Sequence, residues 1–471
     1  MKKLLALIVL LALLVPAAFG EETYPKASYT LTETSLDLAN VSVYAHRDIM
    51  EEYGLGTPRT DNKLQHLGLY KDVIGNEPLV PLYASENMDT IVFQSLACLR
   101  NGKLIIPAAN PNRGAGDPNR SLERLSRSKS FPLLRTPNGL ILSPDGKYAA
   151  YVDSYRALVE RNYNYQLIIL DVESGEYFLG QTWDVKMGKD KKVACVVEAA
   201  FDKNSEYLYY VTYGNQNKYR CSLYRYHLAT GKNELLLNHP EEVYFPNLTF
   251  LSSSRLVAPM AVRDSDEFCG ILVYNKKFLR GWEAAAYSIP VNRRTAYVRR
   301  LQASAESELA LAAVEFNVSY SSSIESYKPT FVGSMLSVID IQKDPVGLDR
   351  ILVFDEEALS CESVTYEEFL TGERFTDTKF ILNYPSLYNA CLTPDGAHAL
   401  TVHRVGDEFA LRLLNLKTLE VKTVEAPEDF DGVFASFNTG MSADYPLGVN
   451  MLSDTLVVIN TSDGVKLYEL K

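Results

Sequence analysis

Arginine and lysine gather in two stretches of an otherwise acidic chain. Residues 113–135 hold six cations against two acidic residues, and residues 293–300 hold four arginines around one tyrosine. The guanidinium is a planar fork that matches a carboxylate or sulfate, so both stretches are candidate sites for an anionic ligand. The alternative is a solvated strand end paired with acidic neighbours. The candidate ligand-binding residues are Arg120 and Arg124 in the first stretch and Arg294, Tyr297 and Arg300 in the second.

The second stretch, 293–300, is predicted to be a strand, and side chains alternate between the two faces of a strand. On that basis Arg294 and Arg300 share one face, and Tyr297 lies on the other. Tyrosine is abundant elsewhere too, with 30 residues in the chain and a dense run between 207 and 226. Rings with a polar tip suit sugars and peptides, but they also suit packing between neighbouring sheets, which we expect here.

Motifs of nucleophilic, metal-dependent or phosphate chemistry are absent from the sequence. It contains no Gly-x-Ser-x-Gly, no His-Glu-x-x-His, no P-loop and no EF-hand pattern. His398 and His403 lie five apart on a predicted strand, so they point to opposite faces. Carboxylate pairs are common, but sequence spacing does not show which of them converge across a cleft. We therefore expect no catalytic residue, no metal site and no cofactor.

The first residues have the pattern of a secretory signal. Lysines precede an uninterrupted apolar run at 4–15, and Ala18 and Gly20 place small side chains before Glu21. An apolar run of this length is too short to span a membrane, which takes roughly 20 residues in a helix. We expect residues 1–20 to be removed and the mature chain to be secreted or extracytoplasmic, in the periplasm or outside the cell, without a transmembrane segment.

The net charge bears on which partners can bind, and the cysteine spacing bears on metal binding and disulfide formation. The formal net charge is −12, and an acidic surface repels phosphate backbones, so nucleic acid is not an expected partner. None of the six cysteines is spaced for a metal. Cys195 and Cys221 fall on the first and third strands of one predicted meander, about 9–10 Å apart and beyond disulfide reach. We expect mostly buried thiols.

Short runs rich in Val, Ile, Leu, Tyr and Thr alternate with turn signals along the whole chain, which is typical of strands. The runs recur as units that begin near residues 140, 196, 247 and 297, and again near 390 and 447. A period of about fifty residues suits a small meander of short strands, which leaves two exposed edges. Closing such meanders into a ring hides those edges.

Two of these units carry the same turn. Ser-Pro-Asp-Gly-Lys-Tyr-Ala-Ala-Tyr occupies 143–151, and Thr-Pro-Asp-Gly-Ala-His-Ala-Leu-Thr occupies 393–401. Asp145 and Asp395 are expected to cap backbone amides of these turns, and the following glycine to take a positive φ. The segments resemble the repeat of TolB-like and WD40-like β-propellers, in which this turn joins the two innermost strands of a blade. The resemblance implies the fold and says little about function.

The sequence therefore predicts an all-β protein formed by a single β-propeller. Seven blades are expected, with six or eight as alternatives, and the last blade lacks a strand that the N-terminal segment 27–46 could supply. Residues 21–471 form this domain, with an irregular first blade at about 85–137 and an insertion at about 355–378. By function it is a non-catalytic binding or scaffold propeller for a protein, peptide or glycan partner, and we expect a monomer. The alternative is an exported enzyme, a glycan lyase or hydrolase or a peptidase, with its site in the central funnel.

The basic cluster yields a direct test. Replacing Arg294 and Arg300 by Glu is expected to weaken binding of a sulfated or carboxylated ligand, because the charge that attracts the anion is reversed. Binding and thermal unfolding of the variant are compared with those of the original chain, and the unfolding temperature should stay the same. Unchanged binding would make both arginines ordinary surface residues.

Overall fold

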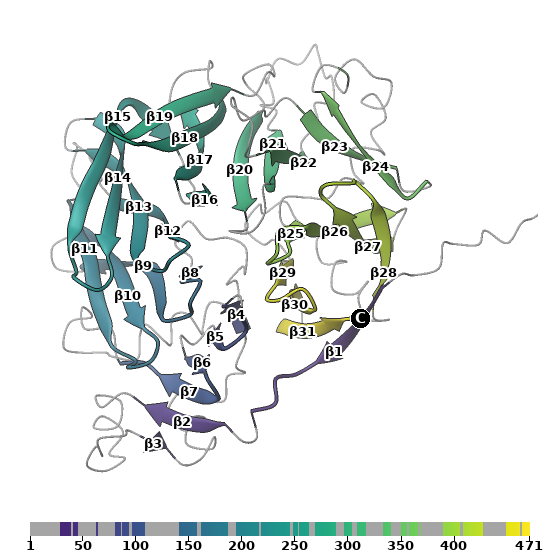
Figure 1. Cartoon of the computed structure of the whole chain (residues 1–471), viewed down its shortest axis with the longest axis horizontal. Coiled ribbons are helices and arrows are strands. Elements are labelled where there is room, and N and C mark those ends of the chain that lie inside the picture. Colours follow the sequence, from purple (N-terminus) through teal and green to yellow (C-terminus); the bar gives the residue numbers. More distant parts are fainter. Residues whose placement is uncertain are drawn as a thin grey trace, which may run out of the picture.

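A computed structural model gives the arrangement of the chain (Figure 1), and every element with defined bounds is a β-strand. Within the described ranges no helix has the length and apolar character needed to cross a membrane. The residues that the structure describes are 29–38, 41–45, 63–64, 81–85, 87–93, 97–108, 141–157, 162–186, 195–215, 218–244, 248–252, 254–262, 269–288, 296–303, 309–316, 333–340, 350–355, 358–365, 368, 390–405, 408–426, 449–461 and 464–471.

The first half of the chain supplies short N-terminal strands and then successive antiparallel meanders. The N-terminal strands are β1 (Tyr29–Thr34), β2 (Ser42–Ala45) and β3 (Lys63–Leu64). The first two meanders are β4 (Pro81–Ala84), β5 (Thr90–Phe93), β6 (Cys98–Arg100) and β7 (Lys103–Ile106), then β8 (Ile141–Leu142), β9 (Tyr148–Ala157), β10 (Asn162–Asp171) and β11 (Tyr177–Lys186). The next two are β12 (Cys195–Phe201), β13 (Tyr207–Asn215), β14 (Lys218–His227) and β15 (Asn233–Tyr244), then β16 (Thr249–Ser252), β17 (Arg255–Val262), β18 (Cys269–Lys277) and β19 (Gly281–Ser288).

The second half continues in the same way. It begins with β20 (Ala296–Ala303), β21 (Leu309–Phe316), β22 (Gly333–Asp340), β23 (Arg350–Asp355) and β24 (Ser360–Thr365). The last strands are β25 (Ala390–Leu392), β26 (His398–Val405), β27 (Glu408–Asn415) and β28 (Val421–Glu425), followed by β29 (Val449–Met451), β30 (Leu456–Thr461) and β31 (Gly464–Leu470).

The meanders lie around a common centre, with their first strands innermost and their last strands outermost (Figure 1). The core sits between neighbouring meanders. Ile169 of β10 and Tyr210 of β13 belong to one buried cluster, and Tyr209 of β13 belongs to the next, with Leu272 of β18. Because side chains alternate along a strand, Tyr209 and Tyr210 bind β13 to the meanders on its two sides. For these tyrosines the predicted packing role is confirmed.

The predicted all-β propeller fold is therefore confirmed, while the count of seven blades stays a prediction. Hydrogen bonding does not divide the described strands into seven sheets. Strands β20 to β22 form one sheet and β23 with β24 another, whereas β1 joins the last two meanders into an eight-stranded sheet. The predicted insertion at about 355–378 overlaps β24. The predicted first blade at about 85–137 starts after β4, with which the first meander begins, and beyond residue 108 it lies outside the described residues.

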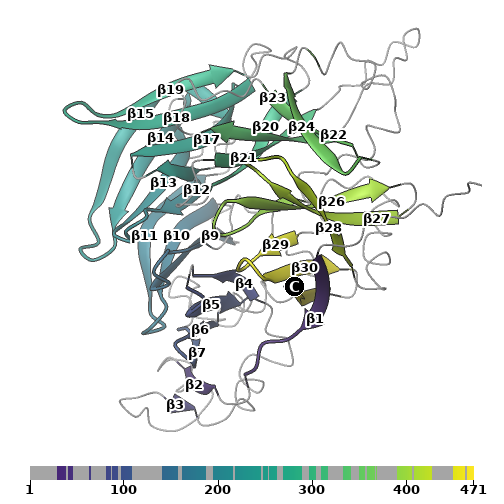
Figure 2. The same ribbon diagram turned by 45° about the vertical axis from the view of Figure 1, so that its right-hand side comes forward.

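The ring closes through the N-terminal strand, as the sequence predicts. Strand β1 pairs antiparallel with β31, with Leu31 opposite Leu470, and supplies the fourth strand of the last meander. Figures 1 and 2 both show the C-terminus beside β1. The predicted closing segment at 27–46 is divided, however, because β2 pairs in parallel with β7 and extends the first meander instead.

The predicted separation of Cys195 and Cys221 is also confirmed. Cys195 lies opposite Tyr213, and Tyr213 lies opposite Cys221, so the whole of strand β13 runs between the two cysteines. Two strand spacings are beyond the reach of a disulfide. Cys98 and Cys391 are buried thiols, as expected.

Closure by β1 leads to a stability prediction. Leu31 is 3% exposed and packs in the cluster that holds Leu400 and Tyr468. Leu31→Ala is expected to lower the free energy of unfolding by about 2–5 kcal/mol, because it removes buried apolar contacts and leaves a cavity. The control is Thr32→Ala, at the exposed neighbouring position, which should change the free energy of unfolding by roughly 0.5 kcal/mol or less. Equal losses in urea unfolding would show that β1 is not part of the core.

Candidate functional site

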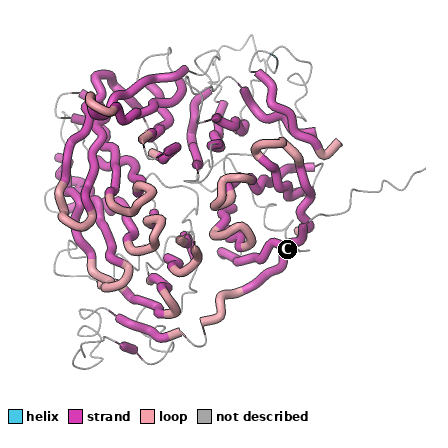
Figure 3. Tube along the Cα trace, in the orientation of Figure 1, coloured by secondary structure: helices cyan, strands magenta, loops and turns pink. Residues whose placement is uncertain are grey.

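The turns that join the first and second strands of the meanders gather around the centre of the ring (Figure 3). We call them the inner turns. In the turn at 143–148, Ser143 Oγ accepts the amide hydrogen of Tyr148 at 2.9 Å and donates to Asp145 Oδ1 at 2.8 Å. Asp145 Oδ1 also accepts the amide of Lys147 at 3.1 Å, and Gly146 has a φ of 68°. Asp145 thus caps its turn, as predicted.

The turn at 393–398 repeats this geometry. Thr393 Oγ1 accepts the amide of His398 at 3.0 Å, Asp395 Oδ1 accepts the amide of Ala397 at 2.9 Å, and Gly396 has a φ of 69°. The predicted capping role of Asp395 is confirmed. His398 and His403 both lie on β26, five residues apart, and so face opposite ways as predicted.

Two further inner turns have the same construction without the Pro-Asp-Gly sequence. Ser85 Oγ accepts the amide of Thr90 at 3.1 Å, and Asp202 Oδ1 accepts the amide of Tyr207 at 2.9 Å. The shared signal is a short oxygen-bearing side chain five positions before the first residue of the second strand. That spacing could have identified these turns in the sequence, since Ser, Thr and Asp commonly bond backbone amides of a turn.

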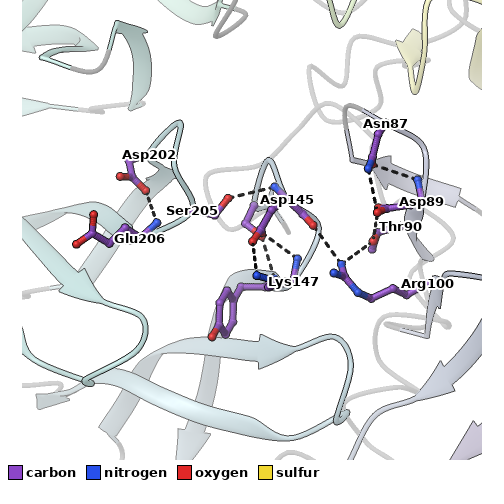
Figure 4. Close-up of polar contacts among 11 residues, drawn as sticks. Asn87, Asp89, Thr90, Arg100, Asp145, Lys147, Asp202, Ser205 and Glu206 are labelled. Carbon is purple, nitrogen blue, oxygen red and sulfur yellow. Dashed lines mark hydrogen bonds and ion pairs between the residues drawn. The ribbon is translucent and has the colours of Figure 1, made fainter.

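The inner turns of three successive meanders are bonded to one another (Figure 4). Arg100 of β6 donates from Nη1 to Thr90 Oγ1 at 2.9 Å and to the carbonyl oxygen of Asp145 at 3.2 Å. The amide of Asp145 in turn donates to Ser205 Oγ at 3.1 Å. Arg100 is only 8% exposed, so this link is shielded from water. Hydrogen bonds therefore hold the three turns, at 85–90, 143–148 and 202–207, in fixed positions relative to one another, and we call these turns the rim.

The carboxylates of the rim have perturbed acidities with identifiable causes. Burial raises the pKa of Asp89, but hydrogen bonds from Ser85, Asn87 and Thr90 and the charge of Arg100 outweigh it, and the pKa lies below its ordinary value. Burial likewise opposes the turn hydrogen bonds at Asp145, whose pKa is also lowered. Both carboxylates are therefore ionised at neutral pH.

Asp202 differs from its neighbours. Burial raises its pKa above the ordinary value, the nearby charge of Glu206 adds to this, and the amides of Tyr207 and Glu206 only partly offset it. Its Oδ1 atom accepts both of those amides. The side chain thus holds its turn together rather than reaching outward.

A cationic and aromatic cluster adjoins the turn at 202–207. The guanidinium of Arg225 lies 4.7 Å from the centre of the Tyr207 ring and donates to Glu234 Oε2 at 2.9 Å. His227 Nε2 lies 3.6 Å from a Glu206 oxygen. Hydrogen bonding from Arg225 holds the pKa of Glu234 below its ordinary value. These pairs fix the orientation of side chains at the edge of the rim.

The predicted anion-binding residues are not all within the described structure. Arg120, Arg124 and Arg294 lie outside the described residues. Tyr297 and Arg300 lie on β20, opposite Glu315 and Ala313. A register shift between Val298 and Arg300 inserts one extra residue, so the strict alternation behind the predicted faces does not run through this strand. Whether these residues bind an anion stays a prediction.

Among the described residues, no group of three or more His, Cys, Asp and Glu side chains is arranged to hold a metal ion. The rim carboxylates accept hydrogen bonds from their own turns. The linked turns of the rim can present a fixed pattern of charges and hydrogen-bonding groups to a partner.

Comparison with known proteins finds similar solved structures but no related sequence family. No family model and no curated protein matches the chain. Similar solved structures include an oligogalacturonate lyase in complex with manganese, at 11% identity over 71% of this chain and 76% of that chain, with a TM-score of 0.41. They also include TolB from Acinetobacter baumannii, at 13% identity over 81% and 75%, with a TM-score of 0.33.

A third similar structure is the β-propeller domain of the Trilobed protease from Pyrococcus furiosus, at 11% identity over 70% of this chain and 80% of that chain, with a TM-score of 0.36. At such identities and TM-scores the likeness says nothing about the function of this chain, and the fold rests on its own strand pairing.

The close contact between these turns predicts that the stability of the protein is sensitive to adding a side chain at Gly146. A Cβ atom there would lie 2.6 Å from Thr90 Cβ and 3.0 Å from Arg100 Nη1, and the φ is positive. Gly146→Ala is expected to lower the free energy of unfolding by about 2–5 kcal/mol, from backbone strain and overpacking together.

Gly102→Ala is the matched control. Gly102 has a similar φ of 72°, but a Cβ there would meet nothing within 4 Å, so only the strain of about 1 kcal/mol applies. The two variants are compared by denaturant unfolding. Equal losses would mean that the contact between these turns does not constrain the rim.

Proposed function

We propose that this chain is an exported, non-catalytic binding or scaffold propeller whose protein, peptide or glycan partner lies on the rim. The observation that carries the proposal is the chain of hydrogen bonds from Thr90 through Arg100 and Asp145 to Ser205, which fixes the inner turns of three meanders relative to one another. A surface held in this way needs little ordering when a partner binds, which favours affinity.

The rim also presents groups that a partner can reach. Asn87, Lys147 and Glu206 are exposed, and each comes from a different turn. Loops carried on a rigid scaffold are common positions for binding residues. Together the three side chains offer an amide, a cation and an anion over one surface, a pattern suited to recognising a polar segment by its shape and charge.

A binding role fits Asp89 and Asp145 of the rim better than catalysis does. General acid–base catalysis needs a group whose pKa lies near the working pH and which can reach the substrate. The pKa values of Asp89 and Asp145 are moved downward instead, and both side chains accept hydrogen bonds within their own turns.

Export is supported by the pattern of residues 1–20, in which lysines are followed by an apolar run and then by small side chains. The proposed mature chain begins at Glu21, acts in the periplasm or outside the cell, and forms one ring of seven blades as a monomer. N-terminal sequencing of protein recovered after export checks the first of these points.

Binding is tested with a library of oligosaccharides and short peptides. For the best binder found, Lys147 and Glu206 are replaced by residues of opposite charge (Lys147→Glu with Glu206→Lys). Binding is expected to weaken about tenfold or more, because the hydrogen bonds that the partner makes to these two charged groups are lost. Dissociation constants are measured by calorimetry, and circular dichroism confirms that the variant is folded.

The matched control is Lys422→Glu. Lys422 lies on β28, away from the inner turns, and its Nζ is 3.8 Å from a Glu420 oxygen, much as Lys147 Nζ is 3.4 Å from Asp145. This variant should bind as the original chain does. Cleavage of any bound library member, or full binding by the rim variant, would overturn the proposal; cleavage would favour the enzyme alternative.

A further inference from the structure

The turns that join the third and fourth strands, here called the outer turns, have one length in three meanders. In each, the last residue of the third strand donates its amide hydrogen to the carbonyl oxygen five positions later. The pairs are Asp171 with Glu176, His227 with Lys232 and Asn415 with Glu420, each at 2.9 Å. The residue after the donor is apolar and buried in all three, namely Val172, Leu228 and Leu416.

A second hydrogen bond identifies the same position in several of the described meanders. The amide of the residue after the donor reaches the carbonyl oxygen at the end of the inner turn, as in Val172 to Lys147 and Leu228 to Glu206. In the β16–β19 meander the corresponding bond runs from Lys276 to Ser254 at 2.9 Å. Asn275 is therefore the equivalent of Asp171.

The β18–β19 hairpin is longer than the outer turns that it replaces. Asn275 pairs with Glu283, eight positions later, and the hairpin continues through Lys276 opposite Trp282 and Lys277 opposite Gly281. Seven residues therefore lie between the paired positions, where each of the three outer turns has four. We call residues 276–281 the β18–β19 tip.

The tip carries apolar side chains in water. Phe278 is 98% exposed and Leu279 is 88% exposed, and among the described residues the other exposed large hydrophobic side chain is Leu235, at 45%. Where the other outer turns bury an apolar residue, this one places Lys276 in solvent. The apolar residues of this hairpin therefore lie in the exposed loop, whereas those of the other three outer turns are buried.

The charges beside these two residues are positive. Lys276, Lys277 and Arg280 are all exposed, and Glu283 is the nearest acidic residue in the hairpin sequence. The whole chain has a formal net charge of −12, so a basic tip stands out against it. The base is fixed, because Trp282 is buried and its ring lies 5.6 Å from that of Tyr209 in the neighbouring meander.

We propose that the β18–β19 tip docks the protein on an anionic lipid surface. Phe278 and Leu279 enter the boundary between headgroups and acyl chains, while Lys276, Lys277 and Arg280 bind the anionic headgroups. Apolar side chains flanked by cations are the pattern of shallow interfacial binding. Two adjacent side chains are too few for a stable protein interface, which takes about 800 Å² from each partner.

This proposal goes beyond the proposed function and does not rest on it, because the tip and the rim use different residues. Outside its two arginine-rich stretches, 113–135 and 293–300, the chain is acidic and is repelled by an anionic bilayer, so the contact proposed here is made by the tip. Binding should therefore be peripheral and should weaken as salt screens the three cations.

The test is flotation of the protein with vesicles of phosphatidylcholine alone or of phosphatidylcholine mixed with phosphatidylglycerol. Residues 1–20 are removed first, since that apolar run would itself bind lipid, and their removal takes away none of the described residues. The chain is expected to float with the mixed vesicles only. Phe278→Ser with Leu279→Ser should lower the partition coefficient about tenfold or more, and Lys276→Gln or Lys277→Gln about fivefold each.

Leu235→Ser is the matched control, because it removes an exposed leucine outside the tip and should leave flotation unchanged. Equal flotation of the Phe278 and Leu279 variant, equal flotation with neutral vesicles, or no flotation of the original chain would overturn the proposal. So would self-association of the original chain that the tip variant abolishes, since the tip would then contact a second copy.

Discussion

The ring depends on the hydrogen bonds that β1 makes along both of its edges. One edge pairs antiparallel with β31, and the other pairs in parallel with β28, with Tyr29 opposite Val424. The amide of Thr30 donates to the carbonyl oxygen of Lys471 at 2.8 Å, and the amide of Lys471 donates back at 3.0 Å. A meander by itself leaves two unpaired edges, which invite pairing with other chains. One N-terminal strand satisfies an edge of each of the last two meanders at once.

The relation between rim and tip follows from the packing of the meanders. Tyr210 holds β13 to the β8–β11 meander, and Tyr209 holds it to the β16–β19 meander. Near the centre, Arg100 ties the β4–β7 meander to the inner turn at Asp145, and Ser205 ties that turn to the β12–β15 meander. Apolar contacts thus fix the spacing of the sheets, and polar contacts fix the turns above them. Surface groups on different meanders therefore keep constant positions relative to one another.

Local pattern was enough to predict much of the fold. Alternating strands, the two Pro-Asp-Gly turns, the separation of Cys195 from Cys221 and the N-terminal closure all depend on residues near in sequence or on an edge that must be paired. The features that the sequence did not reveal depend on register. The extra residue at Arg299 is recognised only from the pairing of β20 with its partner strand β21. The length of the β18–β19 hairpin is recognised only once Asn275 is aligned with Asp171. The contact of Arg100 with Asp145 joins residues that no local pattern relates.

Closure by β1 also sets the order in which the chain can fold. The strand that is synthesised first finds its partners among the last residues, since Leu31 must wait for Leu470. Contacts of such sequence separation form slowly, because a long loop must close before they contribute. Until then the β31 edge is open while the other meanders are already complete. The folding protein therefore passes through an unclosed ring, in which β1 of one molecule and β31 of another are free to exchange, and its yield will depend on how long that state persists.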